Sequence, residues 1–346
     1  MRPVVGVAVL VVALARGMVG ERQQDVVDLA LPTENDALFR GGGAEFYQVI
    51  ERDFRGEKSW PWQGGQYGFV RDPMATARGI IYTRFHEGID VRPRERDQRG
   101  DPLDPVRAIA DGEVVHVNVV PSHSNYGKYI VIEHRWDGAS YYSLYGHLKS
   151  ANVNVGQSVR RGEQIAVLGY TGKGINQARA HLHLELNLML SPNFQSWYDT
   201  FHKEEPNYHG LYNGINLKGI DIAQFYLALR RKPTLSIPEF LADDETFYKV
   251  ALPNSANFDF ARRYPQLVRP GKKTGPRSWI VSFARSGLPL EIEPGVETVD
   301  GPRLVYIKKS AVDYRFLTQN YIAGTGENAH LTREGEQLMQ LLIWPR

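Results

Sequence analysis

The chain of 346 residues contains no cysteine. This absence excludes a disulfide framework, a thiolate metal site and a cysteine for a lipid anchor. Any metal ion must therefore bind to His, Asp or Glu side chains. The formal net charge is only +2, so the global charge gives no reason to expect nucleic acid as a partner.

Long apolar runs are also scarce. The N-terminus has a short basic start, Met1-Arg2, followed by an apolar run from Pro3 to Ala15 that is shorter than the ~20 residues needed to span a bilayer. Small residues at Ala13 and Ala15 offer a cleavage site, and a second possible cut follows Gly20. We expect residues 1–20 to be a signal peptide and the mature chain to be exported, to the periplasm or the exterior, without a membrane span. An uncleaved anchor is the alternative.

Strict alternation marks residues 180–188, Ala-His-Leu-His-Leu-Glu-Leu-Asn-Leu. Alternation is typical of a half-buried strand, so His181, His183 and Glu185 are expected on one face and the leucines on the other. Two imidazoles then share a small volume, where they can supply a metal ligand and a neighbouring general base. For this motif alone, a surface strand with two solvated histidines is an equally good interpretation.

A second motif of the same spacing lies upstream, at residues 85–91, Phe-His-Glu-Gly-Ile-Asp-Val. In an extended segment His86, Gly88 and Asp90 share one face, and Gly88 leaves the space between the other two free of side chain. His86, Asp90 and one histidine of the later pair would form a set of two nitrogen ligands and one oxygen ligand. Such a set leaves the fourth tetrahedral position of zinc for water, as in a catalytic site.

A third histidine lies between these motifs, in Tyr145-Gly146-His147-Leu148. The ordered set His-x-Gly-x-Asp, Tyr-x-His-Leu and His-Leu-His-x-Glu resembles the lysostaphin-like zinc metallopeptidases, which cut peptide cross-links of bacterial peptidoglycan. The resemblance covers residues 80–190, under a third of the chain. It implies that His86, Asp90 and His183 bind zinc, and that His147 and His181 form an unligated catalytic pair.

The resemblance also implies the chemistry. It predicts a secreted zinc metalloendopeptidase that hydrolyses peptide cross-links of peptidoglycan with a zinc-activated water and two catalytic histidines. Zn²⁺ is the expected cofactor and the peptidoglycan peptide the expected substrate, while the oligomeric state stays open. No His-Glu-x-x-His helix is present to supply a glutamate base. His147 and His181 are therefore expected to act as base and oxyanion partner, in either order.

Short strands separated by turn dipeptides fill residues 80–190. Asp111-Gly112 predicts a hairpin that joins residues 106–109 to residues 114–117, and Asp137-Gly138 predicts another. Strand–helix–strand spacing is missing, so we expect a mainly β fold built on an antiparallel sheet, with an additional α+β C-terminal region. One face of such a sheet can form a groove for an extended peptide.

These patterns divide the chain into four parts. We expect a signal peptide (1–20), a linker or pro-segment (21–58), a zinc metallopeptidase domain (59–195) and a C-terminal α+β region of unknown role (196–346). The segment 21–58 is a candidate for a stretch that occludes the zinc site.

The C-terminal region shows ordinary structural signals but no catalytic set. Residues 219–232 predict an amphipathic helix, Ser236 to Glu239 form a capping box for another helix, and Thr332 is expected to cap a closing helix. Strands are expected at 279–283 and 304–307. The region is a candidate for substrate positioning or wall association.

Departures from the family concern the rim of the expected cleft. The loop after Asp90, residues 92–100, is long and charged, and Arg92, Arg94 and Arg96 either hold carboxylates of an acidic peptide or are simply solvated. The same two-way choice applies to Glu185, which either orients an imidazole or forms a peripheral ion pair. His116 and His134 are expected to be structural, and His123, in a loop, is a candidate for a position at the border of the cleft.

Two other functions remain open. If the protein were a non-catalytic regulator of other cell-wall hydrolases, we would expect some of the metal ligands to be replaced. All five key residues are present. A metal-binding wall or carbohydrate module predicts a closed four-ligand zinc site. Hydrolysis that a chelator abolishes would distinguish the peptidase from both alternatives.

Overall fold

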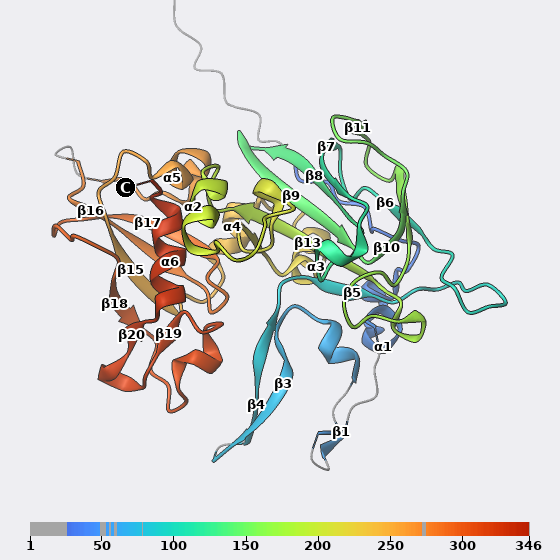
Figure 1. Ribbon diagram of the computed structural model, residues 1–346, viewed down its shortest axis with the longest axis horizontal. Coiled ribbons are helices and arrows are strands. Elements are labelled where there is room, and N and C mark those ends of the chain that lie inside the picture. The colour runs from blue at the N-terminus through green and yellow to red at the C-terminus, as the bar shows by residue number, and fades with distance from the viewer. Residues whose placement is uncertain are drawn as a thin grey trace, which may run out of the picture.

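The computed structural model describes residues 26–48, 53–54, 57–58, 61–77, 79–271 and 275–345. The predicted signal peptide lies outside these residues. Figure 1 shows two bodies side by side, one rich in strands from the first two thirds of the chain and one formed by the C-terminal sheet and helix α6 (Arg333–Leu342). All pairs of named strands are antiparallel. The expected mainly β fold with an α+β C-terminal region is confirmed.

A seven-stranded sheet forms the centre of the first body. Along the sheet the strands are β11 (Ser158–Val159), β7 (Gly112–Asn118), β8 (Tyr129–Trp136), β9 (Ala139–Gly146), β13 (Leu182–Met189) and β14 (Leu217–Gly219). The seventh, β5 (Ile89–Val91), pairs with the start of β13, while β14 pairs with its end. Strand β13 therefore has partners along both edges, and all of its residues are buried.

The alternation predicted for β13 is present. Its four leucines point into the main hydrophobic core, where they are at most 1% exposed. The opposite face is buried as well, because Leu211 and Tyr212 pack over a second small core around Tyr129 and Leu144. These two covering residues follow helix α2 (Phe194–Phe201) in the chain. The polar face of β13 is thus enclosed within the protein, instead of half-exposed as the alternation suggested.

A three-stranded sheet lies against the leucine face and shares its core. Its order is β10 (Leu148–Ala151), β12 (Gln164–Leu168) and β6 (Pro105–Arg107). The hairpin predicted at Asp111-Gly112 is wrong, because β6 and β7 belong to different sheets and do not pair. Gly112 is required by a close approach instead: a Cβ there would lie 2.4 Å from the carbonyl oxygen of Glu133 on β8.

The hairpin predicted at Asp137-Gly138 is confirmed. It joins β8 to β9, with Trp136 paired to Ala139 across the turn. Both turn residues have positive φ, 51° for Asp137 and 74° for Gly138. This is the left-handed backbone that two-residue hairpin turns require.

The N-terminal segment packs on the main sheet. Helix α1 (Gly43–Phe46) ends at a fully buried phenylalanine, Tyr47 forms a bridge to Val91 of β5, and the Gln48 amide donates to the carbonyl of Asp90 at 2.9 Å. Short β1 (Asp53–Phe54) and β2 (Glu57–Lys58) follow, and then a long hairpin of β3 (Gly68–Thr76) and β4 (Gly79–His86). Residues 46–48 thus belong to the core of the first body. The domain limits stay a prediction.

The C-terminal body contains a four-stranded sheet in the order β17 (Pro289–Gly295), β16 (Ser278–Phe283), β15 (Tyr248–Pro253) and β18 (Arg303–Ile307). The other helices and strands that follow β14 in the chain are α3 (Ile222–Arg231), α4 (Ile237–Ala242), α5 (Asp259–Arg263), β19 (Ile322–Ala323) and β20 (His330–Leu331). The predicted caps are confirmed: Ser236 and Glu239 form the capping box of α4, and the Thr332 side chain accepts from the Gly335 amide at the start of α6.

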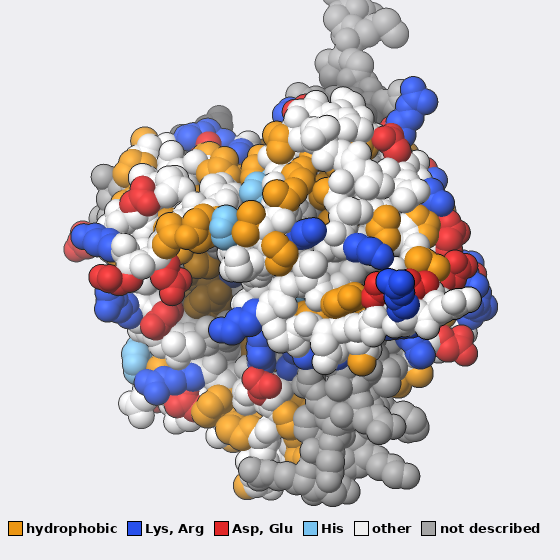
Figure 2. All heavy atoms as spheres, turned by 45° about the vertical axis from the view of Figure 1, so that its right-hand side comes forward, with side chains coloured by type: hydrophobic (Ala, Val, Ile, Leu, Met, Phe, Trp, Pro, Cys, Tyr) orange, Lys and Arg blue, Asp and Glu red, His pale blue; other side chains and the backbone are white. Residues whose placement is uncertain are grey.

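The two bodies share one hydrophobic core. The same cluster of buried side chains extends from Val27 to Ile343. At the junction, the hydroxyl of Tyr264 accepts from the Met189 amide at the end of β13 and donates to the Ser140 carbonyl at 2.9 Å. On the face shown in Figure 2, basic and acidic side chains both occur with apolar side chains among them. Within the described ranges, the helices are all too short or too polar to cross a membrane.

Candidate metal centre

The register of β13 brings the three histidine motifs together. His183 is paired with Asp90 of β5 on one edge and with Gly146 of β9 on the other. His147 directly follows Gly146, and His86 is the last residue of β4, just before the bend that leads into β5. Segments nearly 100 residues apart in sequence therefore meet at one point of the sheet.

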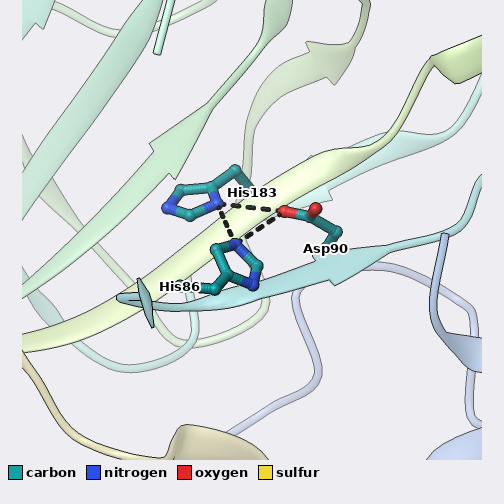
Figure 3. A group of neighbouring side chains, drawn as sticks. All are labelled: His86, Asp90 and His183. Carbon is teal, nitrogen blue, oxygen red and sulfur yellow. Dashed lines mark hydrogen bonds and ion pairs between the residues drawn. The ribbon is translucent and has the colours of Figure 1, made fainter. Parts of the chain in front are cut away.

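Three side chains converge at that point (Figure 3). Nε2 of His86 and Nδ1 of His183 lie 3.1 and 3.0 Å from the same oxygen, Oδ1 of Asp90. The two ring nitrogens are 3.0 Å apart. All three residues are buried, with at most 5% of their surface exposed. Within the described part of the chain, these three residues form a group of acidic and histidine side chains that lie close enough to share one metal ion.

The donor set fits a zinc ion. Nδ1 of His86 lies 2.8 Å from the carbonyl oxygen of Gln66, so it donates its proton there and Nε2 keeps its lone pair. Two imidazole nitrogens and one carboxylate oxygen are common ligands of catalytic zinc. Ligand atoms at ~2.0–2.1 Å from a tetrahedral zinc are about 3.3 Å apart, close to the separations of 3.0–3.1 Å between these three atoms.

Charges at the centre are set by burial and by close neighbours. Burial lowers the pKa of His86 to about 4, so its ring is neutral near pH 7. Burial alone would raise the pKa of Asp90, but the imidazoles of His181 and His86 and the guanidinium of Arg71 hold it well below its usual range. Burial opposes the charged form of His183, yet hydrogen bonds to Asp90 and Glu185 raise its pKa to about 9. The carboxylate of Asp90 is therefore ionised.

His147 and His181 lie beside the three-residue group. Their ring centroids are 4.6 Å apart, and the ring of His147 is 5.9 Å from that of His183. Each Nδ1 faces a backbone carbonyl, that of Thr171 at 2.8 Å and that of Arg179 at 2.6 Å, and donates to it. The Nε2 atoms are therefore left for chemistry, and that of His181 lies 3.4 Å from Asp90 Oδ1.

His147 has an unusual backbone. Its φ is +60°, in the left-handed region that side chains with a Cβ seldom adopt. Burial and the neighbouring His181 and His183 lower its pKa well below the ordinary value. The residue follows strand β9, which ends at Gly146, instead of continuing it. A neutral imidazole is thus fixed on a strained backbone.

Glu185 orients His183, as one of the two sequence-based interpretations predicted. Its Oε1 lies 2.7 Å from Nε2 of His183, and its Oε2 accepts from Nδ2 of the Asn187 side chain at 3.0 Å. The side chain is only 1% exposed. The Tyr126 hydroxyl also hydrogen-bonds to Glu185, and the Tyr126 ring centroid lies 5.3 Å from that of His183.

One residue at the centre has no counterpart in the sequence-based expectations. Arg71 on β3 donates to Oδ2 of Asp90 at 2.6 Å. No local pattern marks it, because the contact arises when the β3–β4 hairpin folds back toward β5. The signal that could have pointed to Arg71 was a hairpin whose second strand ends at His86, because Arg71 lies on the first strand of that hairpin, β3.

Other polar residues that were considered lie outside the centre. Nδ1 of His134 donates to the Asp111 carbonyl at 2.7 Å, which supports the structural role expected for it. The guanidinium groups of Arg92, Arg94 and Arg96 all donate to backbone carbonyls of the chain itself. These internal bonds do not favour a role for the arginines in holding substrate carboxylates.

Sequence comparison places this centre in a known family. The model of peptidase family M23 matches residues 84–193, a range that contains all five candidate residues. The chain carries a peptidase family M23 domain. The lysostaphin-like resemblance expected from the three motifs is thereby confirmed.

The M23 domain is similar to parts of longer proteins. It is 40% identical over 82 residues to the peptidoglycan DD-endopeptidase ShyB of Vibrio cholerae, covering 24% of this chain and 17% of that one. It is 41% identical over 81 residues to the murein hydrolase activator EnvC of Escherichia coli, covering 23% and 17%. The solved catalytic domain of lysostaphin from Staphylococcus simulans is 29% identical, covers 38% of this chain and 86% of that one, and gives a TM-score of 0.25. The chain thus spans under a fifth of the length of these two curated relatives.

Proposed function

We propose that this protein is an exported zinc metalloendopeptidase that hydrolyses peptide cross-links of bacterial peptidoglycan. The observation that carries the proposal is the convergence of His86, Asp90 and His183 on one point, with ligand atoms within 4.8 Å of one another. Two further imidazoles, those of His147 and His181, lie directly beside that point. Three ligands with an adjacent unligated pair suit hydrolysis better than a closed structural site.

The ligands would be Nε2 of His86, Oδ1 of Asp90 and Nδ1 of His183. A zinc ion held there supplies Lewis-acid polarisation of the scissile carbonyl and lowers the pKa of a water molecule. Hydrogen bonds fix the ligands in advance: Gln66 orients the ring of His86, and Glu185 orients the ring of His183. Ligands that are oriented before the metal binds lose little freedom on binding.

His147 and His181 would carry the proton transfers. With each Nδ1 proton donated to a backbone carbonyl, each Nε2 is free to accept a proton from the attacking water or to donate one. One ring, neutral, takes the proton of the water at Nε2 and acts as the base. The other donates a hydrogen bond to the oxyanion of the tetrahedral intermediate from Nε2, which requires that this ring carry a proton on both nitrogens. Burial of both rings strengthens these interactions, because the surrounding dielectric is low.

The substrate class and the location rest on separate support. The name of the similar endopeptidase from Vibrio cholerae supports peptidoglycan as the substrate. The basic and apolar start of the chain supports export, with residues 1–20 as the signal peptide. We further propose that residues 59–195 form the zinc metallopeptidase domain and that residues 21–58 restrict access to it.

A regulator of other wall hydrolases is the second candidate. The similarity to the murein hydrolase activator of Escherichia coli favours it. The burial of all five candidate side chains, each at most 7% exposed, also fits a protein whose centre does not turn over substrate. Retention of a complete ligand set favours the peptidase.

Digestion of purified peptidoglycan tests the proposal. The native chain is incubated with isolated sacculi, and released muropeptides are identified by mass spectrometry, with and without a chelator and with zinc restored. We expect His183→Ala to lose zinc binding and His181→Ala to keep zinc while losing turnover. Hydrolysis by both purified variants would contradict the assignment, and no hydrolysis by the native chain with bound zinc would favour the regulator.

A further inference from the structure

The carboxylate of Asp90 has a different neighbour at each oxygen. Oδ1 faces the imidazole nitrogens of His86, His181 and His183 at 3.1, 3.4 and 3.0 Å. Oδ2 faces Nη2 of Arg71 at 2.6 Å. The two oxygens are therefore not interchangeable in this protein.

We propose that Arg71 is a positioning residue for the metal centre: its guanidinium holds Oδ2 of Asp90 and leaves Oδ1 as the single carboxylate oxygen that faces the metal position. The inference rests on the proposed function, because it takes His86, Asp90 and His183 to be the ligands.

The guanidinium is itself fixed in place. Nε of Arg71 donates to the carbonyl oxygen of Gly64 at 2.9 Å, while Nη2 donates to Asp90. The Arg71 side chain is 23% exposed and that of Asp90 is 8% exposed. A charge-assisted bond in such a partly buried setting is stronger than one on the open surface. Rotation of the Asp90 carboxylate would have to break it.

The hairpin delivers Arg71 and His86 together. Gly68 of β3 is paired with His86 of β4, and the register shifts between Phe69 and Arg71. At that irregularity Val70 is the extra residue on β3, and it changes the direction of the Arg71 side chain that follows it. Because both residues belong to one hairpin, the metal ligand and the arginine that orients a second ligand are positioned by the same two strands.

The C-terminal body contacts the same hairpin. The guanidinium of Arg285 lies over the ring of Phe69, 4.3 Å from its centroid. In the first body, the hydroxyl of Tyr67, just before the start of β3, donates to the carbonyl of Gly219 on β14 at 2.9 Å. The C-terminal body therefore supports the strand that presents Arg71.

The consequence for metal binding follows from the number of Asp90 carboxylate oxygens that can reach the metal. Tetrahedral zinc with three protein ligands needs one oxygen from Asp90 and keeps one position for water. A carboxylate free to turn offers both oxygens, which raises the coordination number and crowds the position of the water. Loss of a group that orients a ligand typically weakens metal affinity about 10–100-fold.

Zinc affinity of the full chain tests the inference. Metal is removed from the purified protein, and zinc is titrated back in competition with a chromophoric chelator. We expect Arg71→Gln to bind zinc about 10–100-fold more weakly than the native chain. The matched control is Arg84→Gln, which removes the same charge from the exposed residue paired with Arg71 across the hairpin and should leave the affinity unchanged.

Cobalt supplies a second readout that a loss of stability alone would not produce. In cobalt-loaded Arg71→Gln we expect weaker visible absorption than in the native chain, because a second carboxylate oxygen raises the coordination number. Native affinity together with a native cobalt spectrum in folded Arg71→Gln would overturn the inference. If the native chain itself binds no zinc, the proposed function fails instead.

A lysine variant covers failure of the glutamine variant to fold. Lysine keeps the charge but cannot reach Gly64 and Asp90 with a planar fork. We expect Arg71→Lys to bind zinc several-fold more weakly than the native chain and to retain part of the native cobalt absorption. Native values for both quantities in Arg71→Lys would overturn the inference.

Discussion

Glu185 and His183 face one another on strand β13, with Oε1 of the carboxylate 2.7 Å from Nε2 of the imidazole. Both are buried, and both project from the same face of the strand two residues apart. The contact turns Nδ1 of His183 toward Asp90. The candidate metal centre therefore depends on a residue that is not one of its ligands.

Replacement of Glu185 should weaken metal binding without removing a ligand. In Glu185→Ala the Nε2 hydrogen of His183 loses its buried acceptor, and the ring loses its fixed orientation. We expect zinc affinity to fall about 10–100-fold, measured by competition with a chelator. Glu95→Gln, at an exposed carboxylate, serves as the control. Equal affinities in both variants would show that Glu185 forms only a peripheral ion pair.

The left-handed backbone of His147 predicts an inverted preference between alanine and glycine. At ordinary positions glycine is less stable than alanine by about 0.5–1 kcal/mol. With φ at +60°, alanine meets the steric cost of about 1–2 kcal/mol that glycine avoids. We expect His147→Gly to be at least as stable as His147→Ala in urea unfolding. The same pair at His181, where φ is not positive, should show the ordinary order, and an ordinary order at both positions would refute the strain.

Gly88 should not tolerate a side chain. A Cβ there would lie 2.3 Å from the Leu184 carbonyl oxygen and 2.8 Å from Cγ of Glu185. Gly88→Ala must therefore push β5 away from β13, at a cost of about 1–3 kcal/mol in stability. It should also weaken zinc binding, because Asp90 and His183 move apart. Gly64→Ala, where a Cβ meets nothing within 4 Å, should be nearly neutral in both measurements; a neutral Gly88→Ala would contradict the packing.

Stability should fall in mild acid because of His134. Burial lowers its pKa from 6.5 to about 4 in the folded chain. Between these values the unfolded chain binds a proton that the folded chain does not, so stability present above pH 6.5 is lost as the pH falls toward 4. The difference corresponds to about 3 kcal/mol.

Urea unfolding of the chelator-treated chain at a series of pH values measures this loss. His134→Gln cannot titrate, so its stability should depend less on pH than that of the native chain, by about 3 kcal/mol between pH 7.5 and 4. His330→Gln, at an exposed histidine, should follow the native curve. Parallel curves for native protein and His134→Gln would exclude the effect.

Much of the local structure was predictable because it depends on near neighbours. The alternation of residues 182–188 forms β13, Asp137-Gly138 forms a hairpin turn, and Ser236 begins α4 with a capping box. Each of these features results from steric limits or hydrogen bonds within a few residues. The same local reasoning went wrong at Asp111-Gly112, because the strands on either side joined different sheets.

The sequence predicted which residues form the candidate site but not how they are arranged. Three motifs in order pointed to His86, Asp90, His147, His181 and His183, but the motifs alone do not contain the distances between them. Those distances come from the pairing of β13 with both β5 and β9. Arg71 was not among the predicted residues, since its bond to Asp90 forms only when β3, a strand outside the matched family range, folds back toward β5.

By itself, then, the sequence determined which side chains were available for chemistry, because residue types and their two-residue spacing on strands are local properties. The tertiary structure decided which atoms face one another: one oxygen of Asp90 toward three imidazoles, and the other toward a guanidinium. That choice depends on the register between strands that are distant in sequence, and the packing of a shared core sets that register.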